Sequence, residues 1–128
     1  MISVLDAEKT IFSYPAQRTD GVNPDNKPNM PIEGQRFRLD PSINVDSLGL
    51  HPVATAVAKA AQKYGFIVMD KGSNAVHAEN GNAVEAATGV NPWDAMFNGT
   101  PGHQILKGFP WDKMQAIQVD YGKPAAAK

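Results

Sequence analysis

The sequence predicts an α+β fold, in which an antiparallel sheet carries one main helix across a face. Apolar residues recur at helical spacing from Pro52 to Tyr64, and Gly65 follows as a stop signal. Phe66–Met69 is a short unbroken apolar run, as in a strand that is covered on both faces. Residues 70–73 have the composition of a tight turn, and residues 74–79 alternate as a return strand. We therefore expect a helix at about 52–64 followed by a two-stranded hairpin, within a sheet that is open or folded over as a sandwich or partial barrel.

The N-terminal part of the chain predicts short strands separated by a long loop. Residues 1–14 carry two apolar groups around a polar turn at 6–9, which favours one or two strands. Residues 15–34 contain four prolines and two glycines without either periodicity, so we expect a long surface loop. Residues 35–39 alternate between apolar and basic side chains, which predicts a half-buried strand whose arginines face water or a partner.

The C-terminal part predicts short helical turns and one further strand. Residues 80–89 are small and polar, and we expect a loop or a frayed turn there. A cap residue, a proline and several large apolar residues predict a short helix near 92–98, docked on the core by its aromatic side chains. A second helical turn is expected near 103–107, and residues 115–121 alternate as a strand.

Length and composition indicate a single domain. With 128 residues the chain can bury a core of its own, so we expect one domain over residues 1–124, the 15–34 loop included, and a tail at 125–128. The sequence has no cysteine, which excludes thiolate catalysis, zinc–thiolate sites and disulfide bonds.

Charge and hydropathy argue against two classes of partner. The formal net charge is −1 and the basic residues are scattered singly, which gives no electrostatic footprint for nucleic acid. No apolar run approaches the roughly 20 residues of a membrane helix, and the N-terminus lacks the plan of a signal peptide. We therefore expect neither a nucleic-acid partner nor membrane insertion.

The histidines predict no metal site. His51, His77 and His103 fall in different predicted elements, and no two of them have the close spacing of a local metal pair. His77 is expected to be a packed or partly exposed side chain instead of a catalytic one. We expect no bound metal and no cofactor.

Carboxylates are the strongest candidates for catalysis, because a suitably spaced pair can hydrolyse a glycosidic bond. Four of them border predicted elements: Asp70, Glu79, Asp94 and Asp112. Turn formation and helix capping explain such positions without any reaction, and we prefer that interpretation. No serine lies in a nucleophile elbow and no glycine loop has phosphate-binding spacing, so we predict no catalytic residue.

Aromatic and loop residues give better support for binding. Tyr14, Trp93 and Trp111 are amphipathic aromatics of the type that stack on sugar rings or anchor protein interfaces, although a tryptophan beside a proline also suits the core. Arg18 and Asp20 lie in the long loop, where they are expected to form an ion pair that pins it; the alternative is contact with a ligand. We take these five residues as the candidate binding residues.

Four stretches together resemble a domain of actinobacterial secreted proteins and of minor tail proteins of actinobacterial phages. The resemblance spans roughly residues 14–124, and its specificity comes from the ordered set: YPAQRTDG at 14–21, GQRFRLDP at 34–41, AAQKYGFIVMD at 60–70 and FPWDKMQ at 109–115. It implies a virion or an extracellular, cell-surface location, and it carries over no catalytic residue. In that family further sequence usually precedes this block, so we expect the first strand to leave a sheet edge open for pairing with another chain.

The sequence therefore predicts a non-enzymatic structural or adhesion module of a phage tail or bacterial surface assembly. Its expected partners are other protein subunits or cell-surface carbohydrate, and a homo-oligomer is one form that such an assembly takes. The alternative is a carbohydrate-active hydrolase that uses a pair of the four carboxylates.

Overall fold

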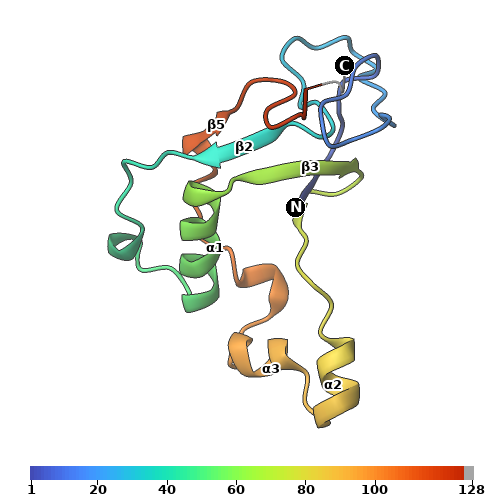
Figure 1. The fold of residues 1–128 in the computed structure, drawn as a ribbon. Coiled ribbons are helices and arrows are strands. Elements are labelled where there is room, and N and C mark those ends of the chain that lie inside the picture. Colours follow the sequence, from blue (N-terminus) through green and yellow to red (C-terminus); the bar gives the residue numbers. More distant parts are fainter. Residues whose placement is uncertain (126–128) are drawn as a thin grey trace.

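A computed structural model of the chain describes residues 1–125 and has an α+β fold, as predicted. Five short strands form one open sheet in the order β4-β1-β3-β2-β5. Figure 1 shows β3, β2 and β5 side by side. The strands are β1 (Ile2–Val4), β2 (Arg36–Leu39), β3 (Phe66–Lys71), β4 (Ala75–Val76) and β5 (Met114–Ala116). The sheet is mixed, because β1 runs parallel to β3 while the other neighbouring strands are antiparallel.

The N-terminal strand β1 lies between β3 and β4. Ile2 is paired with Val68 of β3 on one side and with Val76 of β4 on the other. The predicted direct pairing of β3 with β4 is therefore wrong, and so is the prediction that the first strand leaves an edge open; the edges are β4 and β5. The turn at 70–73 does reverse the chain, but the reversal is wide enough to admit β1, and the amide of Gly72 donates to the carbonyl of Val4 at 2.7 Å.

The helix α1 (Pro52–Lys63) confirms the predicted main helix. It begins where His51 Nδ1 accepts a hydrogen bond from the amide of Val53 at 3.1 Å, and its proline stands in the first turn, where no amide partner is needed. It ends before Gly65, which takes a left-handed φ of 74°. Three alanines on its inner face are fully buried, so the helix axis approaches the sheet closely: Ala54, Ala58 and Ala61.

The core lies between α1 and one face of the sheet, and its buried members are Leu39, Val45, Ala58, Ala61, Phe66 and Phe109. The rings of Phe66 and Phe109 have centroids 6.0 Å apart. Since side chains alternate along a strand, Arg36 and Arg38 lie on the opposite face from Leu39. The Arg36 guanidinium lies over the ring of Tyr121, 5.8 Å from its centroid.

Two short helices form an arm, residues 80–98, that extends away from the sheet (Figure 1). The helix α3 (Pro92–Phe97) confirms the predicted helix near 92–98, whereas α2 (Asn82–Thr88) replaces the loop expected there. The predicted docking of α3 on the core is wrong: Trp93 packs against Phe97 with ring centroids 5.7 Å apart, within the arm. Neither helix has a buried residue, so the arm is held by local contacts.

The chain returns from the arm to the sheet through short helical turns. The predicted turn near 103–107 is present as a 3₁₀ helix (Gly102–Gln104) that continues in turns to residue 108. The predicted strand at 115–121 is shorter than expected: β5 ends at Ala116, and Asp120 takes a φ of 60° in a turn that no strand accommodates.

The long loop, residues 15–34, contains neither helix nor strand, as predicted, but it is packed against the preceding segment. The amide of Glu8 donates to the carbonyl of Pro31 at 2.8 Å, and the amide of Ser13 donates to the carbonyl of Glu33 at 2.7 Å. Asn23 is buried and exchanges hydrogen bonds with the backbone of Lys27. The loop is therefore a defined part of the surface. The tail residues 126–128 lie outside the described residues.

Candidate functional site

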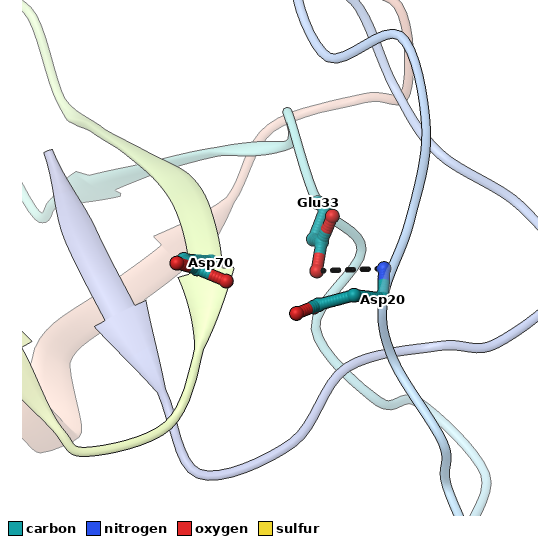
Figure 2. A group of neighbouring side chains, drawn as sticks. All are labelled: Asp20, Glu33 and Asp70. Carbon is teal, nitrogen blue, oxygen red and sulfur yellow. Dashed lines mark hydrogen bonds between the residues drawn. The ribbon is translucent and has the colours of Figure 1, made fainter.

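Three carboxyl groups from distant parts of the chain meet where the long loop contacts β3. Asp20 and Glu33 come from the loop and Asp70 from β3, and each offers an oxygen within 4.8 Å of the others (Figure 2). The amide of Asp20 donates to Glu33 Oε1 at 3.3 Å. We call these three residues the carboxylate cluster.

Glycines allow the close backbone approach that positions the cluster. Gly34 follows Glu33, has a φ of 84°, and donates its amide to the carbonyl of Val68 in β3 at 2.7 Å. A Cβ on Gly34 would lie 1.7 Å from the carbonyl oxygen of Ser13, so no other residue fits there. Gly21 follows Asp20, and a Cβ on it would lie 2.3 Å from the carbonyl oxygen of Ala7.

Two carboxyl groups of the cluster have pKa values shifted in opposite directions. Glu33 is only 5% exposed, and burial raises its pKa to about 7, with the neighbouring Asp20 adding to the effect. The hydrogen bond with the Glu33 carboxyl lowers the pKa of Asp20. Near neutral pH the cluster therefore keeps Asp20 ionised while Glu33 holds a proton for much of the time.

The cluster can bind a proton or a hard cation. Three carboxylate oxygens at this separation suit Ca²⁺ or Mg²⁺, and a proton on Glu33 relieves the same repulsion. None of the three residues lines either of the two adjoining cavities, of about 850 Å³ and about 130 Å³, that β1 and Trp111 border. The cluster therefore ties the long loop to β3 and lies outside these two cavities.

The loop ion pair predicted between Arg18 and Asp20 is wrong. Asp20 faces Glu33 and Asp70, whereas Arg18 is exposed and takes part in none of the ion pairs found in residues 1–125. Sequence reasoning missed Glu33, because an isolated acidic residue in an aperiodic loop carries no signal of burial.

A groove of about 850 Å³ lies on the core side of the sheet, beside the open edge strand β4. Its lining comes from β1, β4 and the segment 102–107, and Trp111 borders it. Trp111 is 45% exposed, and its indole packs against Phe109 with ring centroids 4.2 Å apart. A smaller apolar cavity of about 130 Å³ adjoins the groove, since Ile2, Val4 and Trp111 line both.

The predicted binding aromatics do not gather at one place. Trp111 lines the groove, whereas Trp93 lies in the arm, where its indole Nε1 donates to the carbonyl of Glu79 at 3.0 Å. Tyr14 stands before the long loop, and its amide donates to Asp120 Oδ1 at 2.7 Å. Of these three aromatics, Trp111 is the one that lines the groove.

The four predicted carboxylates are also dispersed. Asp70 belongs to the carboxylate cluster and Glu79 precedes the arm. Asp94 lies in the first turn of α3, and Asp112 pairs with Lys113 at 3.0 Å. None of the four lines the groove or the adjoining cavity.

Comparison with known proteins adds no family or relative to this description. No family model, no curated protein and no solved structure matches the chain. Within residues 1–125, no helix has both the length and the apolar character needed to cross a membrane.

Proposed function

We propose that the chain is a non-enzymatic binding module, a structural or adhesion part of a phage tail or bacterial surface assembly that contacts carbohydrate or a protein partner. The observation that carries this proposal is the groove beside β4 with Trp111 at its border. Its volume of about 850 Å³ falls in the range of ligand sites. A half-exposed indole presents an apolar face to a partner and keeps a hydrogen-bond donor, as at many binding surfaces.

The resemblance to phage tail and bacterial surface proteins supports the assembly context. The stretch 34–41 contains β2, the stretch 60–70 contains the end of α1 and most of β3, and the stretch 109–115 contains Trp111. Three of the four similar stretches therefore contribute to the core or to the border of the groove, whereas the fourth, residues 14–21, lies at the start of the long loop. The open edge of the sheet at β5 adds a place where another chain can pair.

The alternative function is a carbohydrate-active hydrolase. One observation favours it: the carboxylate cluster contains an ionised Asp20 beside Glu33, whose pKa is raised to about 7, as in an acid and base pair. The binding module is the better proposal, because the cluster borders neither cavity. Release of reducing sugar that is abolished both by Asp20→Asn and by Glu33→Gln would favour the hydrolase.

Affinity capture on immobilised polysaccharides and on candidate surface proteins tests the binding module, with the oligomeric state measured in parallel by light scattering. We expect retention on at least one carbohydrate or protein ligand without any change in the ligand. A chain that stays monomeric and is retained by no ligand would overturn the proposal.

A further inference from the structure

We propose that the groove binds an acidic sugar chain, one whose rings carry carboxylate or sulfate groups. This inference rests on the proposed binding function and names the ligand class for the groove. It is carried by three properties of the lining: the sign of its charges, its amide side chains and its exposed indole.

The charges in the groove have one sign. Lys107 and His103 are the lining residues that can carry charge, and no aspartate or glutamate lines the groove. In the described part of the chain neither of them is engaged in an ion pair. The lysine charge is therefore not neutralised by the protein, and a groove with this lining attracts an anion.

The uncharged part of the lining suits a sugar ring. Asn74, just before β4, and Gln104, in the 3₁₀ helix, both line the groove with amide side chains, and an amide can both donate to and accept from hydroxyl groups. Trp111 adds a half-exposed indole to the lining, and Ile2 and Val76 add apolar side chains. Indole stacks on the apolar face of a sugar ring while the amides bind its hydroxyl groups.

An acidic peptide is the competing occupant, because β4 is an edge strand to which a peptide strand could add. The edge argues against it: β4 has only the two residues Ala75 and Val76, so an added strand would find few backbone partners. The lining also offers one exposed aromatic and two amides in place of a row of apolar pockets for alternate side chains. These features favour the sugar chain.

Backbone and indole resonances of the full chain, recorded while ligands are added, test the inference directly. The probes are oligogalacturonate and dextran sulfate, with neutral dextran and a polyglutamate peptide for comparison. We expect both acidic sugars, at low salt, to shift the amides of residues 74–76 and 103–107 and the Trp111 indole. Neutral dextran is expected to bind at least about tenfold more weakly, because it forms no charge-assisted hydrogen bond with Lys107.

Matched variants locate the site. Lys107→Gln should weaken binding of the acidic sugars by about tenfold, whereas Lys113→Gln should leave it unchanged, since Lys113 is paired with Asp112 and lies outside the lining. Trp111→Ala should also weaken binding. Because Trp111 packs on the core residue Phe109, this result is used only if the variant keeps the far-ultraviolet circular dichroism spectrum of the parent. If the spectrum changes, the Lys107 variant alone provides the test, since Lys107 is exposed.

The outcomes separate this inference from the proposed function. If polyglutamate shifts the same amide resonances and neither acidic sugar does, the acidic-sugar proposal is overturned and the groove is identified as a protein-binding site. If the chain captures a carbohydrate or a protein but the resonances of the groove amides do not shift, the groove is not the binding site. The proposal that the chain is a binding module would then still hold. Failure of every ligand together with a monomeric chain would overturn both.

Discussion

Glu33 is a buried carboxyl group whose protonation affects how firmly the long loop is held against β3. Burial raises its pKa to about 7 from an ordinary 4.5, so the folded chain retains a proton that the unfolded chain releases. The folded state then binds more protons between these two values, and stability falls as the pH rises through them. Asp20 acts in the opposite sense, since its pKa is lowered, and its contribution is lost only at pH values below its ordinary 3.8.

We therefore predict that the free energy of unfolding decreases between about pH 4.5 and pH 7, by up to about 3 kcal/mol, and that Glu33→Gln removes the decrease. Glutamine is neutral throughout and its oxygen can still accept the hydrogen bond from the amide of Asp20. Urea titrations at several pH values, with a chelator present so that no cation replaces the proton, measure the effect. The exposed Glu79→Gln is the control, and an unchanged pH dependence in the Glu33 variant would contradict the prediction.

Gly34 is the residue whose replacement should damage the fold most directly. Gly34→Ala combines a left-handed φ of 84° with a Cβ placed 1.7 Å from the carbonyl oxygen of Ser13, so the contact between loop and β3 must open. We expect a loss of about 3 kcal/mol or more. Gly49→Ala is the matched control: it has a similar φ of 62° but open space around it, so it should lose only about 1–2 kcal/mol. Equal losses in chemical denaturation would show that the backbone contact is unimportant.

At the scale of elements, the arm of α2 and α3 is expected to open independently of the sheet. Neither helix has a buried residue, and the apolar side chains Val84, Val90 and Met96 are exposed. Regions with so few buried contacts open at low free energy. Native-state hydrogen exchange should therefore show amides of α2 and α3 exchanging through openings close to zero in free energy, while amides of α1 and β3 exchange near the global value. Equal protection of the two groups would contradict this.

Elements that are encoded by neighbouring residues could be predicted, and pairings between distant segments could not. The helix α1 and the strand β3 follow from apolar spacing and from Gly65, which are all local signals. The helix α2 was not predicted from the sequence, because this segment has no apolar stripe. The helix propensity of its residues was the only local signal for it. The exposed Trp111 was predicted as a binding residue, whereas its place in the groove depends on the β1 and β4 pairing that no local pattern contains.

At the scale of the whole molecule, the fold depends on β1, since this strand joins β3 to β4 and supplies part of the groove lining. Deleting residues 1–5 removes both ladders of β1 and uncovers Val68, which is 1% exposed. The total free energy of unfolding of a domain is only about 5–15 kcal/mol, and we expect the deletion to remove all of it. The shortened chain should therefore lose its cooperative thermal transition.

Replacing residues 82–97 with a short glycine and serine linker is the matching change, since it removes a longer segment that has no buried residue. The armless chain should keep a cooperative transition within a few degrees of the parent, because the sheet, α1 and the groove lining are all retained. It should also bind the same ligand as the full chain, since no residue of the arm lines the groove. Calorimetry and the ligand titration together decide the matter: loss of binding in a folded armless chain would place the binding surface on the exposed helices, and loss of folding would show that the arm supports the sheet.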